Sequence, residues 1–380
     1  MAKENENLAW SQPCSATPLS DAGLLYNFTG IEYSRSCRVP SRAGKVVLLI
    51  HRVLPIMRLM KIVVIGGGIS GCICASQLAK AGHEVRLLEK GRGVGGRMST
   101  RRWGDARIDH GAQFFTARSP RMLKYVEEWR ASKVIIPWYD QIPGRADIPV
   151  GIRYRGENGM TSPAKYLAQF FSSELSFFVE QIERLENRWI IRERDGMNRV
   201  LEADHLVITI PSVQMLELFA RSSISLDGDT MNRLRNINHT RCLALLGLLE
   251  GPSVLNSPGT RTHPVEEVDW ISDNQVKGIS PAASFTLHAS DDYSQKYWDS
   301  PDEDRIPYLL EVAEDCLKSK VLEWKSHRWG FAKPTTTFGA THWHSREWNL
   351  SMAGDGFGGE RIENAALSGL DAASAIQAQA

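Results

Sequence analysis

The segment Lys61-Ile-Val-Val-Ile65 leads directly into Gly66-Gly-Gly-Ile-Ser-Gly71. Its first five residues form an apolar, β-branched run, which is typical of a strand buried on both faces. The glycines have G-x-G-x-x-G spacing: the first allows a tight turn, the second lets the backbone approach a pyrophosphate, and the third lets a helix pack on the strand. The segment therefore predicts a strand, a phosphate-binding turn and a helix N-terminus, which attracts anions.

The residues after this turn complete a strand–helix–strand unit. Cys72 to Ala81 is predicted to form a helix that Gly82 ends, and Glu84 to Glu89 a second strand. Glu89 ends that strand, where an acidic residue accepts a ribose hydroxyl. The fingerprint alone leaves NAD, NADP and FAD open as ligands. The first predicted cofactor contacts are Gly66, Gly68, Ser70, Gly71 and Glu89.

Length and charge narrow the class of protein. The chain has 380 residues, enough for two packed lobes. Its 45 Lys and Arg residues balance 44 Asp and Glu residues, so we expect small-molecule partners rather than nucleic acid or an anionic membrane. No apolar run approaches the roughly 20 residues of a membrane span. Six scattered cysteines favour a reducing compartment, no metal site is predicted, and a soluble cytoplasmic protein is expected.

Residues 1–59 are predicted to lie outside the fold. They begin with the acids Glu4 and Glu6 and make a poor secretory signal. Their basic half, from Arg35 to Arg58, weakly resembles an organelle-targeting arm, which the early acids argue against. Because Met57 and Met60 precede the first strand, we expect a disordered extension or a start codon assigned too far upstream.

Hydrophobic periodicity predicts the later elements. A polar-turn meander is followed by a buried strand, Asp204 to Ile210, which Pro211 ends and which fits a return to the first sheet. The other predicted strands are Phe177–Leu185, Arg188–Glu193, Arg199–Glu202, Arg241–Leu249 and Ala283–His288. The predicted helices are Met215–Ala220, Ile306–Leu322 and Arg361–Gln379.

A second glycine-rich turn narrows the choice of ligand. Gly91-Arg-Gly-Val-Gly-Gly-Arg97, followed by Thr100, carries two guanidinium groups for anionic oxygens. This segment resembles the R-x-G-G-R-x-x-T/S region of the flavin amine oxidase superfamily, where it supports the FAD pyrophosphate and ribityl chain. A basic surface loop is the alternative. The resemblance adds Lys90, Arg92, Gly96 and Arg97 to the predicted cofactor contacts.

Two further blocks carry the resemblance. Asp109-His-Gly-Ala-Gln-Phe-Phe-Thr-Ala-Arg118 is similar to the D-x-G-A-Q-x-F-T-A-R stretch of renalases, especially bacterial ones. Ala353-Gly-Asp-Gly356 and Ile362-Glu-Asn-Ala365 resemble the superfamily's closing flavin motif, where a carboxylate binds ribityl hydroxyls and a helix N-terminus faces the flavin. Val179 falls where the family packs a valine on adenine, although an ordinary core valine is equally compatible. The resemblance thus implies Gly111, Ala112, Gln113, Phe114, Val179, Gly354, Asp355, Ile362 and Glu363 as cofactor contacts.

Substrate-binding residues come from weaker similarity in the middle of the chain. Segments around Trp270, around His288 and from His327 to Ala332 resemble bacterial renalases. A histidine can polarise or orient a carbonyl amide, and a tryptophan offers a flat wall for a nicotinamide-like ring. Packing in the core is the alternative for each. We predict His288, Trp329 and Trp270 as catalytic-site residues.

Two absences shape the cofactor prediction. No cysteine lies near Gly354-Asp355, where covalently flavinylated relatives carry theirs, so non-covalent FAD is expected. No second G-x-G-x-x-G follows a strand, which argues against a reductase with its own NADPH domain.

The resemblance covers nearly all of residues 60–375 and implies a renalase-like flavin oxidase. Such an enzyme moves hydride from 2- or 6-dihydroNAD(P) isomers to FAD and then to O2, giving NAD(P)+ and hydrogen peroxide. One alternative is an amine oxidase or desaturase of the same superfamily, whose lysine near the flavin would be a residue such as Lys277 or Lys333. A flavin-binding protein without turnover is the other.

The predicted fold class is α/β. A Rossmann-like FAD-binding domain of the p-hydroxybenzoate hydroxylase (GR2) type would carry an inserted α+β substrate domain. Residues 60–112, 150–212 and 327–380 are assigned to the discontinuous FAD-binding domain, and residues 113–149 and 213–326 to the substrate domain.

Overall fold

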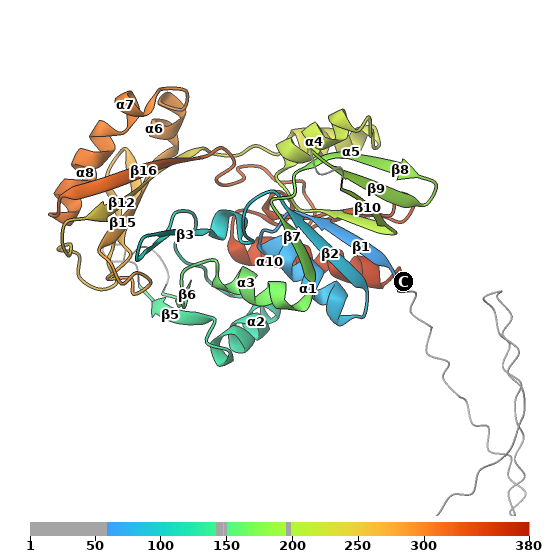
Figure 1. Cartoon of the computed structure of the whole chain (residues 1–380), viewed down its shortest axis with the longest axis horizontal. Coiled ribbons are helices and arrows are strands. Elements are labelled where there is room, and N and C mark those ends of the chain that lie inside the picture. The colour runs from blue at the N-terminus through green and yellow to red at the C-terminus, as the bar shows by residue number, and fades with distance from the viewer. Residues whose placement is uncertain (1–58, 142–146, 148–149, 195–198, 380) are drawn as a thin grey trace, which may run out of the picture. The chain divides into compact units, whose positions relative to one another are not determined.

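The computed structural model describes residues 59–141, 147, 150–194 and 199–379 (Figure 1). The prediction for the N-terminal extension therefore lies, except for Leu59, outside the described residues. No helix among those ranges is long and apolar enough to cross a membrane.

A six-stranded sheet carries the predicted unit. Its core strands are parallel: β1 forms a parallel pair with β2 on one side and another with β11 on the other. In spatial order the strands are β17 (Trp343–Ser345), β18 (Leu350–Met352), β11 (His205–Ile208), β1 (Lys61–Ile65), β2 (Glu84–Glu89) and β7 (Ser172–Leu175). The central strands have nearly continuous buried runs, which explains their apolar sequences. The predicted return of Asp204–Ile210 to the first sheet is confirmed.

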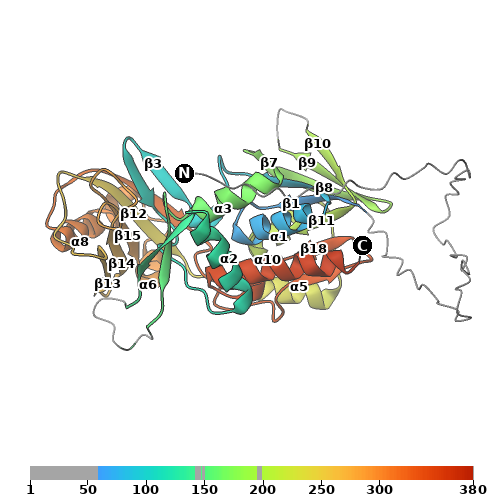
Figure 2. The ribbon, with the colours of Figure 1, turned by 90° about the horizontal axis from the view of Figure 1, so that it is seen from below.

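Helices cover this sheet. Figure 2 shows α1 (Ile69–Lys80) beside α10 (Ile362–Gln377). Helix α1 begins at Ile69, earlier than the predicted Cys72, because the phosphate-binding turn itself enters the helix. The neighbouring helices are α2 (Pro120–Ala131), α3 (Ser162–Leu167), α9 (Asp355–Gly358) and the short 3-10 turns η1 (Gly96–Met98) and η2 (Ala168–Phe170).

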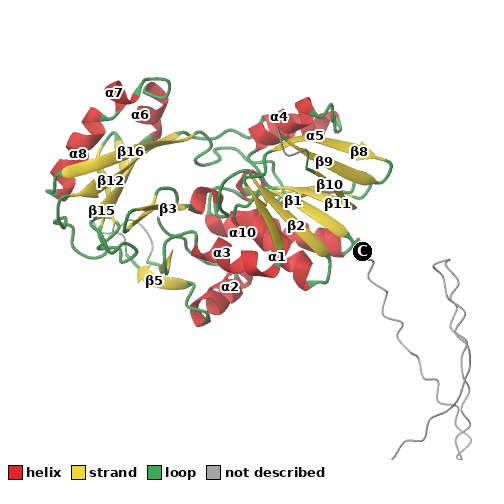
Figure 3. Cartoon of the chain, in the orientation of Figure 1, coloured by secondary structure: helices red, strands yellow, loops and turns green. Residues whose placement is uncertain are grey.

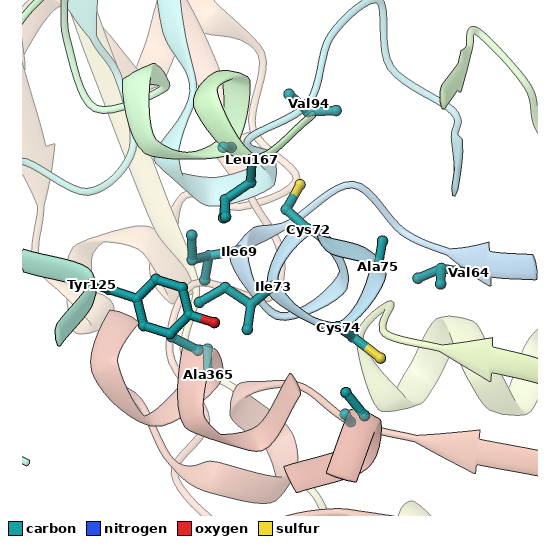
Figure 4. Close-up of a cluster of buried hydrophobic side chains, with 14 of the residues drawn as sticks. Val64, Ile69, Cys72, Ile73, Cys74, Ala75, Val94, Tyr125, Leu167 and Ala365 are labelled. Carbon is teal, nitrogen blue, oxygen red and sulfur yellow. The ribbon is translucent and has the colours of Figure 1, made fainter. Parts of the chain in front are cut away.

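Nearly every side of α1 is buried. Cys72 and Cys74 project from it in different directions into apolar surroundings (Figure 4) and are completely buried. Burial raises the pKa of Cys74 to about 12, so this thiol stays protonated at neutral pH. These positions agree with the packing of an apolar helix rather than with redox chemistry.

Three smaller sheets surround the parallel one. The predicted meander forms an antiparallel sheet beside α4 (Ser212–Arg221) and α5 (Gly228–Arg235). Its strands are β8 (Val179–Leu185), β9 (Arg188–Glu193) and β10 (Val200–Ala203). The two hairpins are β3 (Thr100–Trp103) with β4 (Ala106–Asp109), and β5 (Ile135–Tyr139) with β6 (Arg153–Gly156).

A five-stranded antiparallel sheet, which we call the substrate sheet, completes the described fold (Figure 3). Its order is β13 (Thr260–Val265), β14 (Val268–Asp273), β15 (Ser284–Ala289), β12 (Cys242–Leu249) and β16 (Val321–Trp329). The helices along it are α6 (Asp291–Lys296), α7 (Asp302–Arg305) and α8 (Pro307–Leu317). One face is apolar and shares a core with α8, through Leu245, Phe285 and Leu287 among others.

One predicted element is wrong. The helix expected over Ile306–Leu322 ends at Leu317, because Lys318 adopts a left-handed conformation with φ of 50°. Val321 and Leu322 then belong to β16, which pairs with β12. A β-branched residue just after a helix end is better accommodated in a strand.

Candidate dinucleotide and substrate site

A pocket of about 530 Å³ joins the phosphate-binding turn to the substrate sheet. One part of its wall is the turn after β1 and the end of β2, and another is the end of β16. The predicted site residues that line it are Gly66, Gly68, Glu89, Lys90, Gly96, Arg97, Val179 and Trp329.

The three fingerprint glycines have distinct steric roles. Gly66 has φ of +110°, which only glycine adopts without strain. A Cβ on Gly71 would overlap the carbonyl oxygen of Gly66, so this glycine permits the close contact of helix and strand. A Cβ on Gly68 would meet nothing within 4 Å. Gly68 therefore leaves open the space that a phosphate group would occupy.

Glu89 closes the turn on its other side. Its Oε2 accepts a hydrogen bond from the Gly67 amide at 2.7 Å, and its Oε1 accepts one from the Gly91 amide at 2.6 Å. The carboxylate is thus held at the pocket wall at the end of a parallel strand, where ribose hydroxyls bind in folds of this type. Ser70, at the start of α1, has a buried hydroxyl without a hydrogen-bond partner among the described residues. The residues present therefore fit the ADP half of a dinucleotide.

Arg97 connects this cradle to the C-terminal motif. Its guanidinium group makes a two-pronged ion pair with the Asp355 carboxylate, with Nη2 2.6 Å from Oδ1, and Nη1 also donates to the Phe331 carbonyl at 3.0 Å. Asp355 does not line the pocket itself and reaches it through Arg97. Gly354, just before it, has φ of +140° and donates its amide to the Ser368 hydroxyl.

The second face of the substrate sheet is polar and aromatic. Strand register places Trp270 directly opposite His288, and Ala244 opposite both His288 and His327. Directly opposed residues lie on one face of a sheet. The face opposite the α8 core therefore carries a transverse row of one indole and two imidazoles.

His288 and Trp329 are fixed by the same acceptor. The Nε2 of His288 lies 3.1 Å from the His110 carbonyl oxygen, and the Trp329 indole N–H donates to that oxygen at 2.9 Å. Because a carbonyl only accepts, His288 must carry its proton on Nε2. Burial lowers the pKa of His288 to about 4, so the imidazole is neutral at neutral pH.

His110 itself joins the group. Its ring stacks on Trp329 with ring centres 5.3 Å apart, and His327 packs edge-on against both rings. Burial, with His327 and Arg101 nearby, lowers the pKa of His110 to about 3. The neutral imidazoles and the Trp329 indole thus form one group, of which His327 and Trp329 line the pocket and His288 and His110 do not.

Trp270 belongs to a separate aromatic group. Its ring centre lies 5.7 Å from that of Phe114 and 6.3 Å from that of Trp138, and Tyr139 contacts both Phe114 and Trp138. Trp270 and Phe114 do not line the pocket described above. The structure therefore brings Trp329 to the pocket and places Trp270 in a neighbouring cluster.

A buried ion pair lies between the substrate sheet and the end of β4. The Lys277 ammonium lies 2.8 Å from the Asp109 carboxylate, and it donates to the Gln113 amide oxygen at 3.1 Å. Gln113 donates in turn to the Asp109 carbonyl, and its oxygen also accepts from Ser272. Gln113 therefore holds the substrate sheet against the segment after β4.

Other predicted residues have different surroundings. Glu363 accepts hydrogen bonds from the Arg118 and Ser119 amides, ahead of α2. Gly111 packs tightly on the Arg97 carbonyl and the Trp329 ring, and Ala112 donates its amide to that same carbonyl. Arg92 is exposed, and Ile362 packs against the core that contains α1. None of these side chains lines the pocket.

Sequence reasoning missed several residues of the site. Thr209 donates to the Ile65 and Gly66 carbonyls and lines the pocket. Its position just after a buried parallel strand is a usable signal, because ligands bind at the carboxyl ends of such strands. His110, His327 and Phe178 had no comparable signal, since their roles depend on contacts between distant segments.

Comparisons with known proteins agree with this fold. The family of NAD(P)-binding Rossmann-like domains matches residues 64–129. The 4,4'-diapophytoene desaturase of Staphylococcus aureus is 52% identical over 40 residues, which are 10% of this chain and 8% of the desaturase. The chain thus matches only a short part of that relative.

Solved structures match over a much larger part. A protein described as a protoporphyrinogen oxidase from Exiguobacterium sp. 255-15 has a TM-score of 0.64 at 13% identity, covering 85% of this chain and 100% of that one. Cyclohexylamine oxidase from Brevibacterium oxydans has a TM-score of 0.61 at 14% identity, covering 85% and 99%. The predicted fold class, a Rossmann-like dinucleotide-binding part with an antiparallel substrate sheet, is confirmed.

Proposed function

We propose that this protein is an FAD-dependent oxidoreductase of the flavin amine oxidase and desaturase superfamily. One observation carries the proposal: a single pocket is lined both by the phosphate cradle, through Gly68 and Glu89, and by His327 and Trp329 of the substrate sheet. A redox enzyme requires cofactor and substrate in one water-poor space. Bound FAD supplies the hydride-accepting ring, and its reoxidation by O2 would give hydrogen peroxide.

The residues of this chain would hold the cofactor without a covalent bond. Glu89 would bind the ribose, the amides at the start of α1 would bind the pyrophosphate, and Arg97 with Asp355 would hold the ribityl region. Val179 and Phe178 line the pocket where the adenine would lie. None of the described cysteines lines this pocket, which supports non-covalent binding.

We propose two substrate classes for this site. The similarity to cyclohexylamine oxidase and to a carotenoid-type desaturase favours oxidation of an amine or desaturation of an apolar chain. Of the lysines considered for the amine reaction, Lys277 is buried and paired with Asp109, and Lys333 is exposed.

The second class is a dihydronicotinamide, which is supported by the chemistry of the side chains that line the pocket on the substrate-sheet side. His327 and Trp329, which line the pocket on the side of the substrate sheet, bring no carboxylate to pair with an ammonium group, and the lining carboxylates Glu89 and Glu217 come from β2 and α4. The carboxylates of Asp109 and Asp355 are already engaged by Lys277 and Arg97. Neutral imidazoles and a flat indole instead suit a planar, uncharged ring with an amide. In this class Trp329 would stack on the ring and His288 would orient it.

The division into a cofactor part and a substrate part remains a proposal as well. Residues 60–112, 150–212 and 327–380 would hold FAD, and residues 113–149 and 213–326 would hold the substrate. Helix α2, within 113–149, packs into the core of α1. The substrate role of that segment therefore rests on Phe114, Trp138 and Tyr139.

Flavin absorbance tests both levels of the proposal. Purified protein, or protein reconstituted with FAD, is expected to show a flavin band that acid releases into the supernatant. Protein that takes up no FAD would contradict the cofactor assignment. Anaerobic mixing with 6-dihydroNAD, and separately with cyclohexylamine and putrescine, then identifies the substrate class by which compound bleaches the band within seconds.

A further inference from the structure

A second pocket lies apart from the proposed redox site. It has a volume of about 450 Å³ and shares no lining residue with the first pocket. The β3–β4 hairpin, the segment between α2 and β5, and helix α3 surround it. Four cationic side chains line it: Arg102, Arg107, Lys133 and Lys165.

Two of these cations are held side by side by strand pairing. Arg102 and Arg107 are direct partners across the β3–β4 hairpin. Their side chains therefore stand on the same face, a few ångströms apart, and like charges in this position repel. Neither guanidinium group forms an ion pair with any described residue. Arg107 is held by the Asn158 amide oxygen, at 2.7 Å from Nη1.

A third cation faces the same pair. Burial lowers the pKa of Lys165, and the charges of Arg102 and Arg107 lower it further. The Lys165 ammonium is therefore close enough to both guanidinium groups to be repelled by their charges. Glu157 is the single carboxylate among the lining residues, and its charge also acts on Arg155 outside the pocket. The lining therefore carries four cations against one carboxylate and is net positive.

We propose that this pocket binds a phosphorylated small anion through Arg102, Arg107 and Lys165. Paired guanidinium groups match the oxygens of a phosphate, and an ammonium group adds a third point charge. The Asn158 side chain also lines the pocket, and its NH2 group offers a hydrogen bond to a second phosphate or to a polar substituent, whereas the lining hydroxyls of Thr100 and Ser162 already donate to Asp109 and to the Gly159 carbonyl. This site is independent of the proposed redox function.

Titration with inorganic pyrophosphate tests the proposal. The full-length protein, saturated with FAD so that the first phosphate cradle is filled, is titrated by calorimetry at low ionic strength. Matched additions of sodium chloride control for screening. We expect saturable binding to the wild type and at least ten-fold weaker binding to Arg102→Gln/Arg107→Gln. The variant Lys124→Gln/Arg130→Gln, which removes two exposed α2 charges, should bind as the wild type does.

The unfolding temperature without anion checks that the double variant folds. Because a repulsive cross-strand pair is removed, Arg102→Gln/Arg107→Gln should melt at or above the wild-type temperature, and pyrophosphate should raise only the wild-type value. If this variant does not fold, Lys165→Gln should still weaken binding several-fold. Equal binding by the wild type and the pocket variants, or no binding beyond the chloride control, would overturn the proposal. If ADP binds much more tightly than pyrophosphate, the ligand is a nucleotide. If the two affinities are equal, the pocket recognises a phosphate group alone. Both outcomes support the proposal.

Discussion

The Lys277 ammonium and the Asp109 carboxylate form an ion pair at 2.8 Å, and neither side chain has any exposed surface. The two residues are 168 positions apart and join the turn after β14 to the end of β4. Asp109 also accepts hydrogen bonds from the Thr100 hydroxyl and the Met160 amide. This pair therefore connects the substrate sheet to the segment that leads into the proposed cofactor site.

Breaking this pair should be strongly destabilising. Lys277→Met leaves the Asp109 carboxylate buried without its cation, which costs about 3–5 kcal/mol. We expect that loss in the free energy of unfolding, measured by urea denaturation. In Lys277→Met/Asp109→Leu no unpaired charge remains, so the double variant should lose clearly less than the sum of the single losses. Strict additivity would mean that the two residues are not coupled.

The fingerprint glycines should separate folding from ligand binding. Gly71→Ala forces a methyl group onto the Gly66 carbonyl and should lower the stability of the cofactor-free protein by at least about 2 kcal/mol. Gly68→Ala meets no protein atom within 4 Å and should leave that stability nearly unchanged. Its methyl group would instead occupy phosphate space, so FAD affinity should fall at least ten-fold. Thermal unfolding with and without FAD measures both effects, and a Gly68→Ala protein with wild-type affinity would contradict the cradle.

Glu89→Gln should weaken FAD binding by roughly ten-fold, about 1.4 kcal/mol. Glutamine has one side-chain oxygen, so it can accept only one of the two hydrogen bonds from the Gly67 and Gly91 amides. It also lacks the negative charge that would bind ribose. Glu84→Gln, on the exposed end of the same strand, is the matched control. Fluorescence titration with FAD compares the two variants. If both bind FAD equally well, the ribose role of Glu89 is wrong.

The buried imidazoles predict acid sensitivity. The folded-state pKa values of His288 and His110 are about 4 and about 3, below the ordinary 6.5. The unfolded chain therefore binds more protons between these values, and the free energy of unfolding falls as the pH drops from 6.5 towards 4. His288→Gln keeps a donor for the His110 carbonyl but does not titrate. Melting temperatures at pH 5 to 6.5 should therefore decline less steeply in the variant, and an identical decline would count against a buried neutral His288.

Much of the dinucleotide fold could be read from the sequence alone. The run Lys61–Ile65, the glycines after it and the strand ending at Glu89 use local rules: apolar residues make buried strands, and only glycine fits a left-handed turn or a close backbone contact. One helix end differed from the prediction. The left-handed Lys318 ended α8 five residues before the predicted Leu322, because the pairing of β16 with β12 decides that boundary.

Only the tertiary structure decided which side chains meet. Arg97 and Asp355 are 258 residues apart, and Trp329 reaches the His110 carbonyl across 219. Such contacts depend on strand register and on how two sheets pack, which no local pattern encodes. For that reason the sequence alone indicated Lys61–Glu89 as the place proposed for an ADP moiety, whereas the grouping of His288, His327 and Trp329 and the cation pair Arg102–Arg107 depends on the tertiary structure.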